Sequence, residues 1–181
     1  MYSPRRMAAR ASRIDRSIAI VGMMGAGKST VGRRLAKRLS LPFADADDEI
    51  EKSCGYTVAE IFDRFGESTF REGERRVIAR LAEGPPRVIA TGGGAFAEEA
   101  TRRLILERCI TIWLDADVET LLGRLGRLGH RPLLKGRDPA EAIAELAAKR
   151  TPLYAEAHIR IPTGTAPHAA IVDSICREIG A

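Results

Sequence analysis

The sequence lacks any long hydrophobic run. Its longest apolar stretch that is nearly free of charge covers residues 18–27, about ten residues, whereas a helix that crosses a bilayer needs about twenty. A membrane-spanning protein is therefore excluded by the sequence.

Aromatic residues are also scarce, at 5% of the chain. Proteins that bind single-stranded nucleic acids combine aromatic side chains with a basic surface, and the basic excess here is local. Residues 1–16 hold five arginines and one aspartate, a charge of +4 out of the net +5. We therefore expect no nucleic-acid partner. Residues 1–16 are expected to be a disordered extension, although an Arg-rich, acid-poor segment is also typical of organelle transit peptides.

Only three cysteines occur, and no two of them form a C-x-x-C pair. Neither a disulfide framework nor a zinc site is indicated. None of the three histidines has a metal-binding partner at ligand spacing, so all three are expected to be solvated or part of the core. The cysteines are Cys54, Cys109 and Cys176, and the histidines are His130, His158 and His168. We expect a cytoplasmic monomer that binds no membrane.

Short β-branched runs alternate with longer runs of helical periodicity, which is the pattern of an α/β fold with a parallel sheet. With 181 residues, one domain over residues 17–181 is expected. The five expected strands cover residues 17–21, a short run ending near 44, 88–91, 110–114 and 158–161.

Three helix signals and one loop signal complete the pattern. Residues 29–39 repeat apolar side chains at helical spacing. Thr57 and Glu60 form a capping box that predicts a helix start, and Pro139 after Asp138 predicts another helix, running to about residue 150. Residues 124–137 are dense in glycine and arginine and are expected to form a mobile lid.

A glycine-rich motif follows the first expected strand. Residues 22–29 read Gly-Met-Met-Gly-Ala-Gly-Lys-Ser, which fits G-x-x-x-x-G-K-[ST] between an apolar strand and an amphipathic helix. Glycines let the backbone N–H groups surround a phosphate, and the positive end of the helix faces the same anion. Lys28 is expected to reach the β- and γ-phosphates, and Ser29 to offer its hydroxyl to Mg²⁺. The motif predicts a nucleoside triphosphate with magnesium.

Asparagine and glutamine are absent from the chain. Guanine-specific switches with the same loop recognise their base through N-K-x-D and position water with a glutamine, so a Ras-like GTPase is excluded, and the chain is short for a motor or transport ATPase. A small-molecule kinase is therefore favoured. Such an enzyme needs groups that hold its acceptor in line with the γ-phosphate.

Two segments at the carboxyl edge of the sheet, where ligands bind in open parallel sheets, could contact an acceptor. Asp45 and Asp47 follow the second strand, and three glycines at residues 92–94 follow the third. The alternatives are that Asp47 or Asp48 caps the next helix and that the glycines form a flexible turn. Arg71 and Arg150 could hold a carboxylate, or each could be a surface salt-bridge partner.

Together these segments resemble shikimate kinase, in order and from residue 17 to about residue 161. The matching motifs are the loop from Gly22 to Thr30, Asp45-Ala-Asp47, Phe70-Arg71, Gly92-Gly-Gly-Ala95, Arg131-Pro-Leu-Leu134 and Lys149-Arg-Thr-Pro-Leu-Tyr154. The resemblance implies a three-layer α/β/α fold of the P-loop kinase type, with a five-stranded parallel sheet and a mobile lid. It implies transfer of a phosphoryl group from ATP to the 3-hydroxyl of shikimate, a step of chorismate and aromatic amino acid biosynthesis.

The resemblance also implies residue roles. Asp47 would orient the shikimate hydroxyls, Arg71 and Arg150 would hold the carboxylate, and Gly93 would add a backbone contact. Ser29 would bind Mg²⁺, with Asp45 in the outer shell of the ion. The implied ATP contacts are Gly25, Ala26, Gly27, Lys28, Ser29, Thr30, Arg124 and Arg131, with Arg124 stacking on adenine and Arg131 reaching the phosphates from the lid.

Two competing hypotheses remain. A gluconate-type kinase would share the phosphate loop but would not need the arginine pair. A nucleotide-binding regulatory protein could keep the fold without turnover, although the complete set of motif residues favours an enzyme.

Overall fold

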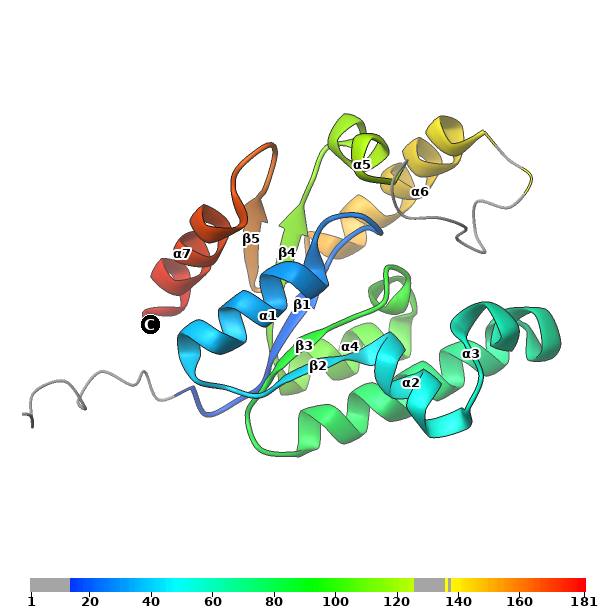
Figure 1. The fold of residues 1–181 in the computed structure, drawn as a ribbon, viewed down its shortest axis with the longest axis horizontal. Coiled ribbons are helices and arrows are strands. Elements are labelled where there is room, and N and C mark those ends of the chain that lie inside the picture. Colours follow the sequence, from blue (N-terminus) through cyan, green and yellow to red (C-terminus); the bar gives the residue numbers. More distant parts are fainter. Residues whose placement is uncertain (1–13, 126–135, 137) are drawn as a thin grey trace, which may run out of the picture.

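The computed structural model describes residues 14–125, 136 and 138–181. Five parallel strands form one sheet in the order β2-β3-β1-β4-β5 (Figure 1). The strands are β1 (Ile18–Val21), β2 (Phe43–Asp45), β3 (Val88–Ala90), β4 (Ile110–Asp115) and β5 (Ile159–Pro162). All five strands that the sequence predicts are present, so the expected α/β class and the parallel sheet are confirmed.

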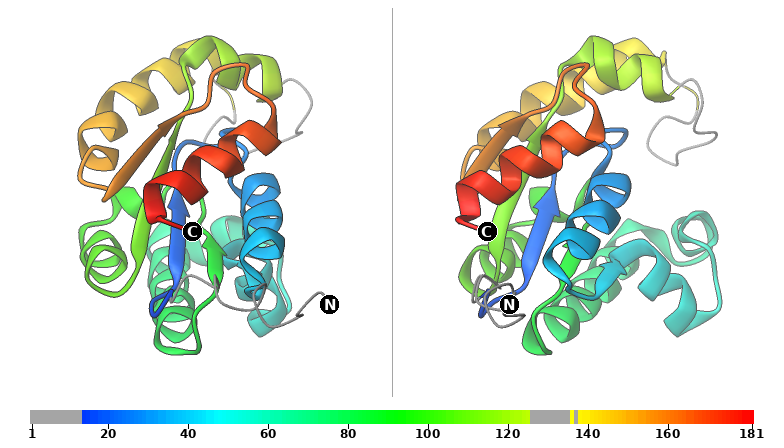
Figure 2. Two further views of the ribbon diagram at one scale, coloured as in Figure 1. Left: turned by 90° about the vertical axis from the view of Figure 1, so that its left-hand side faces the viewer. Right: turned by 60° about the vertical axis from the view of Figure 1, so that its left-hand side comes forward.

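Helices cover both faces of the sheet. They are α1 (Lys28–Leu39), α2 (Ala46–Cys54), α3 (Val58–Glu83), the short 3₁₀ helix η2 (Ala95–Ala97), α4 (Glu99–Arg108), α5 (Val118–Leu125), α6 (Pro139–Tyr154) and α7 (His168–Ile179). Helices α1 and α7 pack together on one face, and α3 and α4 pack together on the other (Figure 2). Right-handed crossovers explain why α1 and α4 lie on opposite faces, because the chain leaves β1 toward β2 but leaves β3 in the opposite direction, toward β4.

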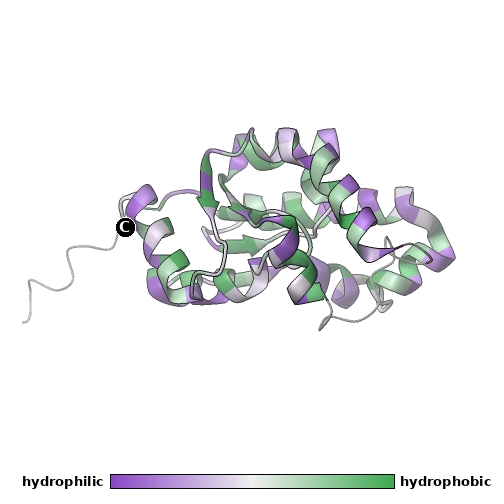
Figure 3. Cartoon of the chain, turned by 90° about the horizontal axis from the view of Figure 1, so that it is seen from above, coloured by the Kyte–Doolittle hydropathy of each residue, from purple (hydrophilic) through white to green (hydrophobic). Residues whose placement is uncertain are grey.

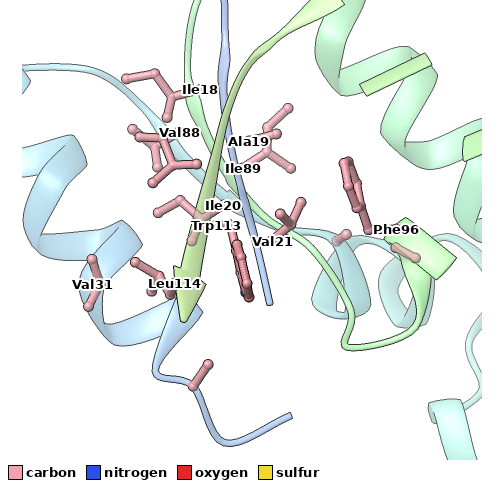
Figure 4. Close-up of a cluster of buried hydrophobic side chains, with 14 of the residues drawn as sticks. Ile18, Ala19, Ile20, Val21, Val31, Val88, Ile89, Phe96, Trp113 and Leu114 are labelled. Carbon is pink, nitrogen blue, oxygen red and sulfur yellow. The ribbon is translucent and has the colours of Figure 1, made fainter. Parts of the chain in front are cut away.

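The core is built on β1, whose four side chains are all fully buried (Figure 4). Strand β1 pairs with β3 on one side and with β4 on the other, with Ile18 opposite both Val88 and Ile110. A strand between two neighbours and two helix layers exposes neither face, which explains its continuous apolar sequence. Figure 3 shows the same division, with hydrophobic residues concentrated on the sheet and hydrophilic residues on the outer helix surfaces.

Three local predictions need correction. Asp45, not Asp47 or Asp48, caps α2: its carboxylate accepts the backbone N–H groups of both later aspartates. Residues 124 and 125 lie in α5 rather than in the loop. Helix α6 continues past the expected residue 150 to Tyr154.

The capping box of Thr57 and Glu60 is present at the start of α3. Within that helix Gly66 has a φ of 83° and a non-helical conformation, so the helix consists of two parts joined at a kink. A positive φ of this kind favours glycine. The part before Gly66 and the part after it can therefore face one ligand from different directions.

Most of the predicted lid, including Arg131, and most of the predicted N-terminal extension lie outside the described residues. Over the described ranges, no helix has both the length and the apolar character needed to cross a bilayer.

Two helical glycines give a test of core packing. In α1 a Cβ on Gly32 would lie 2.7 Å from the ring of Phe43, whereas a Cβ on Gly73 in α3 would meet nothing within 4 Å. We expect Gly32→Ala to lower the free energy of unfolding by about 1–3 kcal/mol through overpacking. Gly73→Ala should raise it by about 0.5–1 kcal/mol through helix propensity. Denaturant unfolding of both variants measures this, and the same sign for the two would contradict the packing described here.

Candidate active site

The loop between β1 and α1 has the backbone of a phosphate-binding cradle. Gly22, Gly25 and Gly27 all have positive φ, at 146°, 80° and 91°. A Cβ on Gly22 would also lie 2.7 Å from the carbonyl oxygen of Leu114. The conformation therefore favours glycine at all three positions, and close approach also requires it at Gly22.

Lys28 lies within this cradle and is buried. Its ammonium group donates hydrogen bonds to the carbonyl oxygens of Gly22 (2.9 Å) and Met23 (2.8 Å). The loop thus curls around a positive charge that also lies at the N-terminus of α1, where the helix dipole favours an anion. This arrangement fits the binding of nucleotide phosphates.

Ser29 and Asp45 meet beside the cradle. The Ser29 hydroxyl lies 2.5 Å from Oδ2 of Asp45 and donates to it, while Oδ1 of Asp45 caps α2. One oxygen of the carboxylate is thus used for structure and the other faces the nucleotide side. Hydroxyl and carboxylate oxygens are the ligand types that Mg²⁺ prefers. In the described part of the chain no cluster of three or more His, Cys, Asp or Glu side chains could hold a metal.

A pocket extends from the cradle toward α5 and α7, and Arg124 and His168 form part of its lining. Arg124 donates hydrogen bonds to the carbonyl oxygens of Ala26 (3.2 Å) and Gly164 (3.3 Å). Partial burial, with the charges of Arg34 and Arg124, lowers the pKa of His168. His168 thus lines the pocket that adjoins the phosphate-binding loop, a position that its isolated place in the sequence does not reveal.

A second pocket lies between the two parts of α3 and the glycine loop, residues 92–94. Its lining consists of Met24, Asp47, Val58, Phe62, Phe70, Arg71, Glu74, Gly92, Gly93 and Gly94. Both pockets include Met24, Asp47, Gly92 and Gly93. The half-buried Asp47 therefore stands where the two pockets meet.

Arg71 is held in this second pocket by a buried ion pair. Its guanidinium lies 2.7 Å from Glu74, whose side chain is fully buried, and 3.2 Å from the exposed Glu67. Burial raises the pKa of Glu74, and the nearby charge of Asp47 adds to the rise against the opposing effect of Arg71. The surface salt-bridge alternative for Arg71 is therefore not supported, because only 15% of its side chain is exposed.

Arg150 is also buried, near the end of α6. Its guanidinium donates a hydrogen bond of 2.9 Å to the carbonyl oxygen of Gly93. The hydroxyl of Tyr154, one helical turn later, donates to the same oxygen at 2.7 Å. The guanidinium groups of Arg71 and Arg150 thus both adjoin residues 92–94, since a Cβ on Gly94 would lie 2.2 Å from Nη2 of Arg71.

The glycine loop is closely packed rather than a flexible turn. A Cβ on Gly92 would lie 2.6 Å from Oε1 of Glu74 and 2.9 Å from Oδ1 of Asp47. A Cβ on Gly93 would lie 3.1 Å from the amide nitrogen of Met24. Three glycines in succession are therefore explained by side chains and backbone that approach the loop from three directions.

The sequence reasoning did not identify Glu74 and Tyr154 as parts of the site. Glu74 lies on the buried stripe of α3 with Phe70, Val77 and Ile78. A charged residue at a core position of a helix indicates a buried functional or structural role, and this pattern could have identified Glu74. Tyr154 follows Arg150 at a spacing of four, which places the two on one helix face.

Comparisons with known proteins agree with this geometry. A model of the shikimate kinase family matches residues 24–180. The chain is 53% identical over 160 residues to a shikimate kinase of Caulobacter vibrioides, covering 88% of this chain and 80% of that protein. It is 56% identical over 159 residues to one of Rhodopseudomonas palustris, covering 88% and 78%.

Solved structures give the same result. A shikimate kinase from Acinetobacter baumannii in complex with shikimate aligns with a TM-score of 0.87 and 39% identity, covering 91% of this chain and 92% of that one. A gluconokinase from Sinorhizobium meliloti aligns with a TM-score of 0.61 at 18% identity, covering 93% of each chain, which shows a shared fold alone.

Removing Glu74 tests the importance of the buried ion pair. We expect Glu74→Ala to lower the free energy of unfolding by about 3 kcal/mol, because it leaves the buried Arg71 without its nearer counter-ion. The matched control is Glu72→Ala in the same helix, which removes an exposed partner of Arg76 and should change stability by less than about 0.5 kcal/mol. Equal effects in urea unfolding would contradict the structural role of the pair.

Proposed function

This chain belongs to the shikimate kinase family, and we propose that its two pockets hold ATP and shikimate, with Asp47 between them. The enzyme transfers the γ-phosphoryl group of ATP to the 3-hydroxyl of shikimate. The products are ADP and shikimate 3-phosphate, on the route to chorismate and the aromatic amino acids. The observation that carries the proposal is that both pockets are lined by Met24, Asp47, Gly92 and Gly93. Substrates in separate pockets that share one wall can react directly.

Arg71 and Arg150 bind the carboxylate of shikimate in this proposal. Both guanidinium groups are largely buried and adjoin the glycine loop from different helices. A guanidinium presents a planar fork of donors that matches a carboxylate. The two guanidinium groups would bring positive charge and N–H donors to the carboxylate of an anionic acceptor.

Asp47 orients the hydroxyls of the acceptor. An ionised carboxylate has several acceptor positions, and this one lies at the junction of the pockets. In the reaction a bond forms between the 3-hydroxyl oxygen and the γ-phosphorus, the bond from that phosphorus to ADP breaks, and the hydroxyl proton passes to water, directly or through Asp47. A loose transition state makes little demand on a base, so Asp47 acts first by orientation.

The cradle residues bind the phosphates of ATP. Lys28 exchanges its contacts with the loop carbonyls for contacts with the β- and γ-phosphates, and the amides of residues 25–30 surround the phosphates. Arg124 lines the nucleotide pocket and donates to the carbonyl oxygen of Ala26, and we assign it to stack on the base. We also assign Arg131, which lies outside the described residues, to the ATP phosphates, whose negative charge its guanidinium would offset.

Mg²⁺ fits the oxygen pair of Ser29 and Asp45, with Ser29 as the direct ligand and Asp45 holding a water of the ion. A bound Mg²⁺ would offset the negative charge of the phosphates. The Ser29 hydroxyl is oriented for this by Asp45, and Asp45 is itself fixed as the cap of α2. We also place the reaction in the cytoplasm and assign it to a monomer.

A panel of acceptors tests the proposed substrate. ADP release should depend on shikimate and should stay at background with gluconate or nucleoside monophosphates. A rate with another acceptor and none with shikimate would contradict the assignment.

The two arginines give a residue-level prediction. Arg71→Ala and Arg150→Ala should each raise the KM for shikimate about 10- to 100-fold, since each removes a charge-assisted hydrogen bond, and should leave the KM for ATP almost unchanged. The matched controls are Arg76→Ala on α3 and Lys149→Ala on α6, both exposed residues, which should leave both constants unchanged. Equal losses for ATP and shikimate would refute a role in acceptor binding.

Asp47 should affect turnover rather than nucleotide binding. We expect Asp47→Asn to lower kcat about 100-fold or more, because orientation of the attacking hydroxyl contributes to the transition state. The dissociation constant of a non-hydrolysable ATP analogue, measured by calorimetry, should change less than about twofold. A variant with weakened analogue binding and normal kcat would be inconsistent with this role.

A further inference from the structure

The hydroxyl of Tyr154 occupies an unusual position for a core tyrosine. The residue is 1% exposed, and its ring stacks on Phe96 from η2 and on Trp113 from β4, with centroids 5.9 Å apart in both pairs. Packing alone would be satisfied by phenylalanine. The hydroxyl instead donates a 2.7 Å hydrogen bond to the carbonyl oxygen of Gly93 in the acceptor pocket.

That carbonyl oxygen is shared between two donors. Arg150 donates to it at 2.9 Å and Tyr154 at 2.7 Å. A carbonyl oxygen has two lone pairs, so the two contacts fill its normal capacity. Because the Tyr154 hydroxyl uses one lone pair, the Arg150 guanidinium can donate only one N–H group to the Gly93 carbonyl oxygen. Its other N–H groups remain for a ligand.

The peptide groups around Gly93 are fixed from both sides. The carbonyl of Gly92 accepts the amide of Ala95 (3.2 Å), and the carbonyl of Gly94 accepts the amide of Ala97 (3.1 Å). Between them, the carbonyl of Gly93 is fixed by side chains from α6. Because a peptide group is planar, holding this carbonyl also sets the direction of the next N–H group of the loop.

Arg102 supports the same arrangement from α4. It donates to the carbonyl oxygen of Phe96 (3.3 Å) and forms an ion pair with Glu156 (3.3 Å), just beyond the end of α6. The glycine loop and the end of α6 are thus linked by the ring stack, by this bridge and by the shared carbonyl. Of these links, only the shared carbonyl involves a proposed substrate ligand.

We propose that Tyr154 is a positioning residue for shikimate, which sets the orientation of the Arg150 guanidinium through the Gly93 carbonyl oxygen to which both side chains donate. The inference rests on the proposed function, because it takes Arg150 as a ligand of the acceptor carboxylate. Burial raises the pKa of Tyr154 to about 12, so the hydroxyl remains a donor throughout the range in which the enzyme can be assayed.

Tyr154→Phe removes the hydroxyl and keeps the stacked ring. We expect kcat/KM for shikimate to fall about 3- to 10-fold, the effect of one hydrogen bond, mainly through KM. The affinity for a non-hydrolysable ATP analogue should stay within about twofold of the parent enzyme. The matched control is Tyr56→Phe, which removes the hydroxyl of a tyrosine that is absent from the acceptor-pocket lining and should leave both values unchanged.

A purely structural role would make the kinetic loss follow the loss of stability. Trp113→Phe disturbs the same ring stack without touching the shared carbonyl. It should lower Tm at least as much as Tyr154→Phe and leave kcat/KM for shikimate within about twofold. If it lowers kcat/KM as much as Tyr154→Phe does, the proposal is wrong.

A double-mutant cycle with Arg150→Ala gives the decisive comparison. Because the hydroxyl acts through Arg150, Tyr154→Phe should cause less than about a twofold further loss in the Arg150→Ala background. A full additional loss in that background, or no loss from Tyr154→Phe alone, would overturn the positioning role while leaving the proposed function intact. No loss from Arg150→Ala alone would overturn both.

Discussion

The parallel register of three neighbouring strands is the constraint on which the site depends. Ala90 of β3 lies opposite both Asp45 of β2 and Ile20 of β1, so the strands end at nearly the same level. The phosphate-binding loop, the aspartates and the glycine loop therefore start from one edge. Because the connections leave β1 and β3 toward opposite faces, a crevice opens at this edge, as is general for open α/β sheets.

The two sides of this crevice hold different charged groups. On the nucleotide side Lys28 and the N-terminus of α1 provide positive charge inside a backbone cradle. On the acceptor side Arg71 pairs with the fully buried Glu74 and with Glu67, whereas Arg150 donates to the carbonyl oxygen of Gly93. Burial of a guanidinium favours an anionic ligand, because the ligand supplies compensating negative charge. The two largely buried guanidinium groups thus suit the acceptor site to a carboxylate.

Much of this arrangement could be predicted from the sequence, because its signals are local. The apolar strands, the loop at residues 22–29 and the capping box of Thr57 and Glu60 each depend on residues close together in the chain. The contacts that link distant segments could not be predicted. The burial of Glu74 against Gly92 and the Gly93 carbonyl shared by Arg150 and Tyr154 depend on how helices pack around the glycine loop. The cap of α2 shows why local sequence was not sufficient there. Asp45, Asp47 and Asp48 are all residues that can cap a helix, and only the backbone geometry shows that Asp45 does so.

The central claim is that one continuous crevice holds both substrates, with the arginine pair at one end and the phosphate cradle at the other. A crystal structure with ADP, Mg²⁺ and shikimate measures this directly. The account predicts the shikimate carboxylate within hydrogen-bond distance of Arg71 and Arg150, and the 3-hydroxyl beside Asp47, facing the β-phosphate of ADP. A shikimate molecule whose carboxylate contacts neither arginine, or whose 3-hydroxyl faces away from the nucleotide, would contradict it.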